Sequence, residues 1–506
     1  MKKKYIFALL AAVAGLSSCD MDTMPENSIP DTEALQTPTD FNNMREGLYT
    51  SLRGVTGSEY MAVETMCDGF NAVAGFSNTY GQVYRWQTTS EDGTYSAVYG
   101  NYQGMITKAN FIIDGYNKCD MSNTILFTPE AKATISQIKG EAFFTRAYSL
   151  FQLAQFFCAD YDKSTADAAN SGVSYRLDYN PSSDASTYPG RNTLNETYKQ
   201  INADLDSAAA RITELGSVSA ARLTVDAVTA LRARIALATD NYADAAKYAT
   251  ELINSGTYSL SADDVDLTSL WQEDGGMETI VQFAVKGTSE LPTALGRYYL
   301  PYTNDGNPDY IPTKDLVELY SDNDYRKTVY FLDGTINTPA GTTGDVLEFN
   351  KYIDHGKIWN DNGQNESARF CIEPKLFRIA EMYLIAAEAY AQSGDLKNAS
   401  AYLNELEASR IANFEDRTYA NKDDLMAELK DERRREMVGE GTRLFDLKRW
   451  HEGVKRGEPQ QLDLTVEPGQ TQSTAMNRPA NDPRLTWPIP KHELNVNPKI
   501  VQNPGW

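Results

Sequence analysis

Two segments of the chain carry the mixture of side chains that binds sugars. Such sites combine flat aromatic rings, which stack on the C–H faces of a sugar, with amide, carboxylate and guanidinium groups that bond to hydroxyls. Residues 68–94 and 297–310 hold these types among residues that favour loops. We therefore predict ligand contacts there, the alternative being that the rings only pack loops onto helices. The candidates are Asp68, Asn71, Asn78, Tyr80, Tyr84, Arg85, Trp86, Tyr298, Tyr299, Tyr302, Asn304 and Asp309.

Catalytic chemistry finds less support in the sequence. A glycoside hydrolase needs two carboxylates flanking a cleft, and no recognisable catalytic motif surrounds any of the 70 acidic residues. The only histidines are His355, His451 and His492, and neither an H-E-x-x-H nor a G-x-S-x-G motif occurs. We predict that the protein is not an enzyme, with a surface glycoside hydrolase as the lesser alternative.

No metal or other cofactor is expected. The turn at residues 304–309 gathers Asn304, Asp305, Asn307 and Asp309, and calcium favours such oxygen ligands. The turn lacks the spacing and the closing glutamate of an EF-hand. Calcium is therefore only the alternative to an empty turn.

The N-terminus predicts export and a lipid anchor. Lys2, Lys3 and Lys4 precede about a dozen apolar residues, the pattern of a signal peptide and too short for the ~20 residues of a membrane span. The sequence Leu-Ser-Ser-Cys at residues 16–19 is similar to a bacterial lipobox, in which Cys19 is acylated. Several acyl chains give durable anchoring. An ordinary secreted protein with a chance cysteine is the alternative.

Four cysteines follow the anchor: Cys67, Cys119, Cys158 and Cys371. No C-x-x-C spacing occurs, which disfavours zinc and thioredoxin-like chemistry. Export permits disulfides, but a chain of this length can build its core without them. We expect buried free thiols.

The charge disfavours a nucleic-acid partner. The formal net charge is −23, and removal of residues 1–18 leaves 44 basic against 70 acidic residues, or −26. Nucleic-acid binding depends on Lys and Arg contacts to phosphate. The same balance disfavours broad contact with anionic lipid, so we expect membrane attachment through the anchor only.

Apolar residues recur with helical period in several places. Residues 141–157 predict one helix, and residues 227–253 and 379–406 each predict two helices joined by a turn, with small alanines where the helices cross. Such pairs are tetratricopeptide-like and need stacked neighbours to bury their apolar faces. Further helices predicted at residues 41–53, 95–117 and 196–215 would supply these neighbours.

The residues between the two predicted helix pairs differ from them in composition. Residues 279–285 are rich in β-forming types, and residues 304–309 are typical of a turn. We predict a mainly α, tetratricopeptide-like scaffold that carries a mixed insertion of loops and short strands. The segments are a signal peptide (1–18), a lipidated tether (19–40), an N-terminal helical part (41–255), the insertion (256–373) and a C-terminal part (374–506), all in one folded globule. The final stretch, 487–506, is rich in Pro and Asn and is expected to lack regular structure.

Five segments in a fixed order resemble the SusD/RagB family of Bacteroidetes outer-membrane lipoproteins that bind nutrients. Together they span nearly the whole chain, although no single one is decisive. The first is the lipobox with its acidic tail and Pro25, and the second is GEAFFTRAY at 140–148. The third is RIAEMYL at 378–384 with AEA at 387–389, LN at 403–404 and Arg410. The fourth is ERRRE at 432–436 with EGTRLFDLKRW at 440–450, and the fifth is PIP at 488–490 with NP at 497–498 and QNPGW at 502–506.

The resemblance implies a function. Family members bind a nutrient, usually an oligosaccharide or polysaccharide, and act as a lid on a SusC-like TonB-dependent transporter. It also implies an outer-membrane location on the extracellular side, since the acidic residues after Cys19 resemble surface-export signals. Peptide uptake, or a scaffold with no ligand of its own, remain alternatives.

The family motifs themselves are mostly scaffold. We expect the arginines at 433–435 to be paired with acids rather than to form an anion site, and Arg443 and Asp446, which stand at i and i+3, to bond internally. Tyr383 and Tyr390 are expected to pack in the core.

Overall fold

The computed structural model describes residues 34–57, 59–302, 306–465 and 476–506. The predicted signal peptide, Cys19 and the tether up to residue 33 lie outside these ranges. Helices make up most of the regular structure and the strands are short, so the predicted mainly α fold class is confirmed. Among the described helices, none is both long and apolar enough to cross a membrane.

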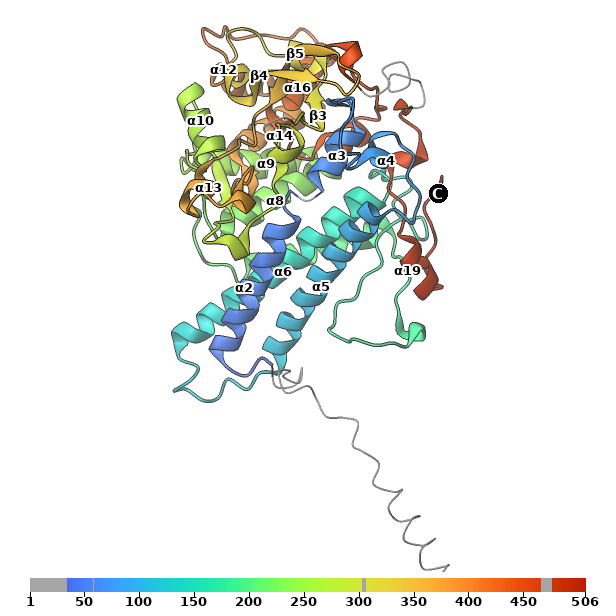
Figure 1. Cartoon of the computed structure of the whole chain (residues 1–506). Coiled ribbons are helices and arrows are strands. Elements are labelled where there is room, and N and C mark those ends of the chain that lie inside the picture. Colours follow the sequence, from blue (N-terminus) through green and yellow to red (C-terminus); the bar gives the residue numbers. More distant parts are fainter. Residues whose placement is uncertain (1–33, 58, 303–305, 466–475) are drawn as a thin grey trace, which may run out of the picture.

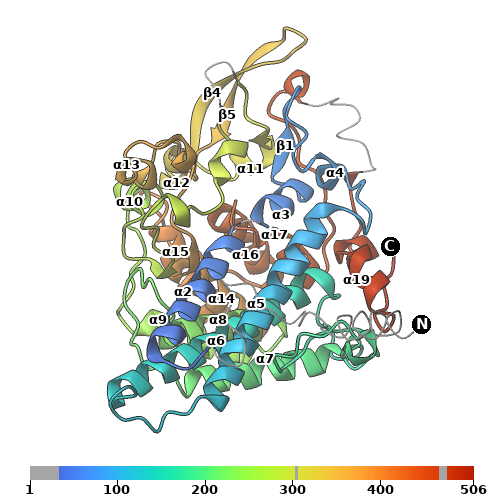
Figure 2. The same cartoon turned by 60° about the horizontal axis from the view of Figure 1, so that its bottom comes forward.

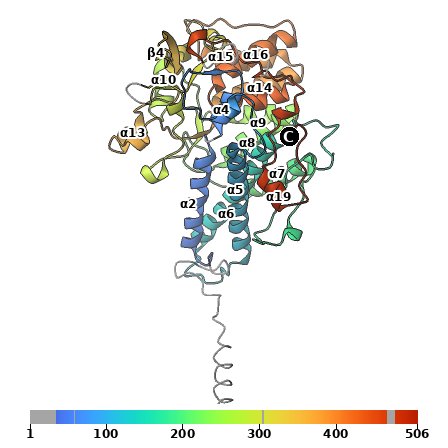
Figure 3. The same cartoon turned by 45° about the vertical axis from the view of Figure 1, so that its right-hand side comes forward.

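Long helices from the N-terminal half form a column. Helices α2 (Pro38–Val55), α5 (Gly93–Lys118) and α6 (Pro129–Phe157) lie side by side (Figure 3), and α7 (Leu194–Ala209) packs on α6. Thr128 caps α6 and Pro129 takes its first position, where a missing N–H costs nothing. A Cβ at Gly140 would lie 2.9 Å from the Ile212 side chain, so this glycine lets α6 approach the segment after α7.

Two helix pairs far apart in sequence form the tetratricopeptide-like part. Helices α8 (Val225–Ala238) and α9 (Tyr242–Asn254) pack against α14 (Ile379–Gln392), which pairs with α15 (Leu396–Ala408). Side chains of Asn241 and Asp395 cap the second helix of each pair. Helix α14 is buried on nearly every face because α8, α9, α15 and α16 (Lys422–Met437) surround it. All helices predicted from periodicity are present.

One strand inside the insertion pairs with a strand that directly follows the insertion. Strand β2 (Thr279–Gln282) pairs antiparallel with β6 (Lys375–Arg378), and β4 (Phe331–Asn337) with β5 (Thr343–Phe349) forms a hairpin that projects in Figure 2. Strand β1 (Phe70–Ala72) pairs with β3 (Tyr310–Pro312), which joins the insertion to the N-terminal half.

Mostly short helices, together with α16, complete the described chain (Figure 1). The expectation that residues 487–506 lack regular structure was wrong, because α19 forms one short helix immediately after Pro490. The remaining elements are α3 (Tyr60–Met66), α4 (Gly81–Tyr84), η1 (Ala185–Thr187), α10 (Asp264–Gln272), η2 (Thr288–Glu290), η3 (Leu295–Tyr298), α11 (Lys314–Glu318), α12 (Tyr325–Tyr330), α13 (Lys357–Asp361), η4 (Glu366–Ala368), α16 (Lys422–Met437), α17 (Arg443–Arg449), η5 (Leu462–Leu464), η7 (Pro483–Leu485) and α19 (Lys491–Val496).

The four described cysteines are free thiols. Cys67, Cys158 and Cys371 are buried as expected, whereas Cys119 is partly exposed at the end of α5. Burial raises the pKa of each buried thiol, so these groups remain neutral and unreactive.

A buried cluster of charges joins the insertion to the C-terminal helices. Glu436 on α16 accepts hydrogen bonds from three arginines at 2.8–3.1 Å. The arginines are Arg326 at the start of α12, Arg378 at the end of β6 and Arg410 after α15. Burial by itself would raise the pKa of Glu436, but these guanidinium groups outweigh it and hold the pKa well below its ordinary value. We call this group, with Glu278, Asp324, Lys351, Glu432 and Glu440, the ionic core.

Replacing Glu436 should destabilise the fold strongly. In Glu436→Gln the three buried guanidinium groups lose their shared counter-charge, so the free energy of unfolding should fall by about 3–5 kcal/mol at neutral pH. The native pKa is depressed, so the carboxylate stabilises the fold above its unfolded-state pKa. The difference from wild type should therefore shrink as the pH falls toward the native pKa. Urea unfolding of the soluble protein at several pH values measures both.

Glu318→Gln is the matched control. Glu318 forms an exposed pair with Lys314 at 3.7 Å, and such pairs contribute about 0–1 kcal/mol. Equal losses in the two variants would contradict a special role for the ionic core.

Candidate ligand-binding surface

The two segments predicted to bind ligand meet in the structure. Strands β1 and β3 place residues 70–72 beside residues 310–312. Next to the strands, the Asp309 carboxylate accepts hydrogen bonds from the backbone N–H and the hydroxyl of Ser77, both at 2.7 Å. The Tyr310 hydroxyl donates to the carbonyl of Thr79 at 2.5 Å. Loops separated by more than two hundred residues therefore form one surface.

Partly exposed tyrosines line this surface. The rings of Tyr80 and Tyr298 meet edge to face at 5.8 Å, and Tyr302 is 51% exposed. The guanidinium of Arg297 lies 5.5 Å from the ring of Tyr298 and 5.1 Å from that of Tyr302. We call Tyr80, Tyr298, Tyr302 and Arg297 the aromatic rim. Its rings and cation are the groups that hold sugars by stacking and hydrogen bonds.

The phenols of Tyr80 and Tyr298 are neutral at physiological pH. Burial raises the pKa of Tyr80 to about 12, and it also raises the pKa of Tyr298. Both hydroxyls can therefore donate a hydrogen bond as well as accept one. Beside them, Arg85 donates to the side-chain oxygen of Asn78 at 2.9 Å, which orients an exposed amide.

Several predicted contacts are instead supports beneath the surface. Trp86 is only 2% exposed and its indole N–H donates to the Met66 carbonyl at 3.0 Å. Tyr84 and Tyr299 are buried in an aromatic cluster with Phe70 and Tyr310. Asn71 is buried and donates to the carbonyl of Gly457 at 3.3 Å. These side chains cannot stack on a ligand approaching from solvent, because protein atoms already cover them.

Asp68 is also a support. Its carboxylate forms a two-pronged pair with Arg443 at 2.7 and 2.9 Å and lies 3.8 Å from Arg434. Burial would raise the pKa of Asp68, but these cations lower it far below its ordinary value. The pair ties the first loop to α16 and α17. Arg443 is therefore bonded within the protein, although its partner is Asp68 and not Asp446 at i+3.

The other family-motif charges are paired as expected. Arg433 meets Asp446 at 2.7 Å, Asp446 also meets Arg449 at 2.9 Å, and Arg435 meets Glu432 at 2.7 Å. Tyr383 is buried, and Tyr390 stacks on Tyr402 with ring centroids 5.7 Å apart. These motifs are scaffold, and they leave no free cation cluster for an anion site.

Sequence reasoning missed some residues of this region. Arg456, buried, lies 4.3 Å above the ring of Tyr84 and donates to the carbonyls of Thr65, Phe70 and Tyr84 at 2.9–3.0 Å. Phe370 and Arg369 approach Tyr302 at 6.1 and 6.0 Å. No local pattern distinguishes these three positions, since only the folded chain brings them here.

Two predicted sites cannot be placed. Asn304 and Cys19 lie outside the described residues. Within the described ranges, no three His, Cys, Asp or Glu side chains gather as metal ligands would.

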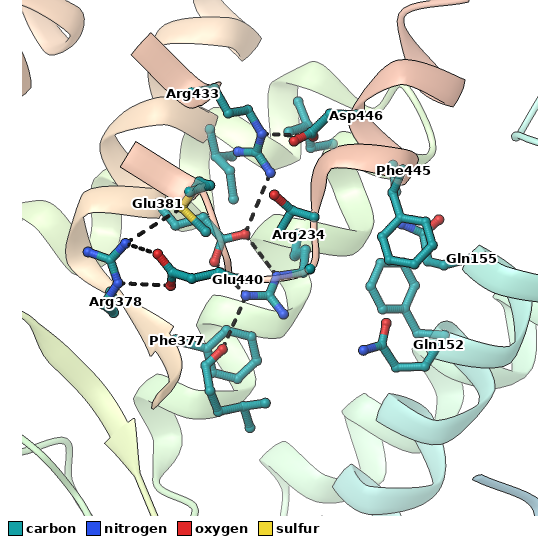
Figure 4. A pocket seen from close by; sticks show the side chains of 18 of the residues that line it. Gln152, Gln155, Arg234, Phe377, Arg378, Glu381, Arg433, Glu440, Phe445 and Asp446 are labelled. Atoms are coloured by element: carbon teal, nitrogen blue, oxygen red, sulfur yellow. Dashed lines mark hydrogen bonds and ion pairs between the residues drawn. The ribbon is translucent and has the colours of Figure 1, made fainter. Parts of the chain in front are cut away.

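One interior pocket is lined by charged side chains but is small. A cavity of about 60 Å³ between α6, α8, α14 and α17 is lined by the side chains in Figure 4. Arg234 pairs with Glu381 at 2.5 Å, and Arg378 pairs with Glu440 at 2.5 Å. The space suits a few water molecules, and its charged groups bind one another, so we assign it to the scaffold.

Comparisons with known proteins agree on one family. The model of the SusD family matches residues 348–506, and a model described as "Starch-binding associating with outer membrane" matches residues 21–237. SusD-like protein P38 of Formosa agariphila is 23% identical over 98% of this chain and 97% of its own length. SusD-like protein P25 of the same organism is 30% identical, but the match covers only 38% of this chain and 34% of that protein.

Solved structures share the fold. A SusD superfamily protein of Bacteroides thetaiotaomicron aligns with a TM-score of 0.75 and 23% identity, covering 92% of this chain and all of that one. A SusD-like carbohydrate-binding protein of Bacteroides vulgatus aligns with a TM-score of 0.73 and 19% identity, covering 92% and 98%.

Loss of the Asp68 carboxylate should loosen the first loop. Asp68→Asn removes the charge that Arg443 and Arg434 share, so the backbone amides of residues 69–86 should exchange with deuterium faster. The global stability should fall by about 3 kcal/mol or less, because the pair is only partly shielded from water. Hydrogen exchange measured by mass spectrometry resolves this segment.

Asp322→Asn provides the comparison, since Asp322 pairs with Lys327 at the exposed surface. Unchanged exchange of residues 69–86 in Asp68→Asn would show that the β1–β3 pairing alone holds the loop.

Proposed function

The chain belongs to the SusD/RagB family, and on this premise we propose that it is an outer-membrane nutrient-binding protein that captures oligosaccharide on the aromatic rim. The observation that carries the proposal is the meeting of two distant loops to expose three tyrosines and an arginine. Their supports are buried and bonded, so the rim is held in place before ligand arrives. A preorganised surface loses less conformational entropy on binding.

A binding role fits the rim better than catalysis. Glycoside hydrolysis requires an acid with raised pKa and a second carboxylate facing the same bond. Near the rim, Asp309 uses its carboxylate to bind Ser77, which fixes the two loops together. We therefore propose that the protein releases bound sugar without cleaving it.

We also propose that Cys19 carries the lipid and that the partner is a SusC-like TonB-dependent transporter. The lipobox and the family membership support both. A tether keeps the folded part at high effective concentration near its partner, which suits a lid that opens and closes many times.

Binding should depend on the rim tyrosines. In the soluble protein lacking its leader and Cys19, Tyr298→Ala and Tyr302→Ala should each weaken oligosaccharide binding by about 3- to 10-fold, the equivalent of one aromatic contact of ~0.5–1.5 kcal/mol. Calorimetry against neutral glycans, acidic glycans and peptides measures the affinity. Each mixture is also assayed for new reducing ends or peptide termini.

Tyr248→Ala on α9 is the control, because Tyr248 is a partly exposed tyrosine of the helical repeat. Arg297→Met tests the charge of the rim, and a loss confined to acidic glycans would identify an acidic sugar as ligand. Turnover of any ligand would contradict the binding role, and saturable binding of peptides alone would contradict the sugar.

The lipid anchor has its own test. Cys19→Ser should move the protein from the membrane fraction to the soluble fraction of cells and abolish labelling by an acyl-chain analogue, because no thiol remains to be acylated. Cys119→Ser, which alters the partly exposed thiol of the folded part, should leave both unchanged. Membrane retention of Cys19→Ser would show that something other than this lipid holds the protein.

A further inference from the structure

A groove runs along helix α5, away from the aromatic rim. A cavity of about 340 Å³ lies between α5, the segment 174–189 and α19, and a neighbouring cavity of about 220 Å³ continues along α5. Residues 179–181 line both cavities. We call the two together the α5 groove; its helices are labelled in Figure 1. From Tyr99 to Lys118 the helix rises by ~28 Å, so the groove is long enough for an extended ligand.

Side chains from the helices hold the outer wall in place. Gln103 donates to the Ser174 carbonyl at 2.8 Å, and Asn110 donates to the Arg176 carbonyl at 3.0 Å. Asn110 is itself fixed by Arg146 at 2.7 Å. On the other side, the Asn497 amide donates to the Pro189 carbonyl at 2.8 Å. The groove is therefore built into the fold.

The lining has the chemistry of a sugar site. Tyr175, Tyr179 and Tyr188 each present a partly exposed ring. Beside them, the carboxylate of Glu493 accepts no hydrogen bond from any side chain or backbone N–H of the described residues. Burial raises the pKa of Glu493 and brings that of Tyr175 to about 12. Rings together with an unengaged acceptor match the C–H faces and hydroxyls of a pyranose.

The charges on the wall of the larger cavity favour a neutral ligand, and the smaller cavity is bordered by one base, Lys118, and one acid, Asp114. Arg176, the basic residue on the wall of the larger cavity, is paired with Asp178 at 3.0 Å and also donates to the Thr187 carbonyl. Nearby, the ammonium of Lys499 donates to two backbone carbonyls at 2.8 Å. An anionic ligand would have to displace these partners, whereas hydroxyl groups would not.

An extended peptide fits less well. Peptides that bind in extended form usually add a strand to an open sheet edge through backbone hydrogen bonds. Here the carbonyls of Ser174, Arg176 and Pro189 already accept from side chains, and no described strand borders the groove.

We propose that the α5 groove is a second binding site for a neutral oligosaccharide, distinct from the aromatic rim. No residue lines both sites. The sugar class rests on the proposed function, but the site does not depend on the rim. Two sites on one chain would let a long glycan be held at two points, which raises its overall affinity through effective concentration.

Binding stoichiometry tests the second site. Calorimetry of the soluble wild-type chain with neutral oligosaccharides of increasing length should give two short ligands per chain. Tyr175→Ala with Glu493→Gln should remove one of them and leave the rim site intact. The double variant Tyr298→Ala with Tyr302→Ala should remove the ligand at the rim and leave the groove site intact. The single variants Tyr175→Phe and Glu493→Gln change few atoms. Each should weaken ligand binding in the groove by about 3-fold or more. Tyr248→Ala should change neither.

The outcomes separate the two proposals. One ligand per chain that is lost only in the rim variant would overturn the groove site and keep the proposed function. One ligand lost only in the groove variant would keep the groove and overturn the rim. Binding in the groove of peptides but not of oligosaccharides would overturn the sugar class. If no oligosaccharide binds at all, both proposals fail.

Discussion

The burial of charge around Glu436 is the constraint on which the structure depends. Charged groups in an apolar interior cost several kcal/mol each unless they are paired with good geometry. The ionic core meets this requirement only when α12, β6, α16 and the segment directly after α15 stand in one arrangement, since each contributes a member. A shifted insertion or helix pair would leave a guanidinium buried without its carboxylate. The core therefore specifies how the insertion sits on the helical repeat.

The same logic extends outward from the ionic core to the candidate site. Glu432 and Glu436 hold α16 in place through the ionic core. Arg434, also on α16, and Arg443 on α17 both pair with Asp68. Asp68 begins the loop that continues into β1, and β1 pairs with β3, which follows the second loop. The exposed tyrosines are thus held in position by a series of buried contacts that starts at the ionic core. A rigid scaffold beneath variable loops is the usual basis for changing a ligand without changing a fold.

How much of the structure the sequence predicts depends on how far apart in the chain the interacting residues lie. Helices at residues 227–253 and 379–406 follow from local period, and their ends follow from Gly256 and Gly394 in left-handed conformations. In contrast, the first turns of α6, residues 129–140, were missed. That helix packs against α2, α5, α7 and α8, so it lacks the single apolar stripe on which a periodicity search relies. The three-residue pairing of β1 with β3 has no local signal at all, and the burial of Trp86 depends on Met66 and Arg478, which are far away in sequence.

The ionic core leaves the outer surface acidic, because it buries its basic and acidic side chains together. The chain has 47 basic against 70 acidic residues, and Arg326, Arg378 and Arg410 are fully buried. The acids that these arginines neutralise are buried with them, so the remaining exposed charge is still strongly negative. At physiological salt, this field is screened beyond about 8 Å, and a ligand at the rim responds mostly to the groups beside it. There the exposed guanidinium of Arg297 lies beside Tyr298 and Tyr302, whereas Arg369 near Tyr302 is already paired with Asp354. On the proposed function, a sugar with a single acidic group can meet that guanidinium, but further negative charges would find Arg369 already paired with Asp354 and Glu366, so neutral or sparsely charged glycans are favoured.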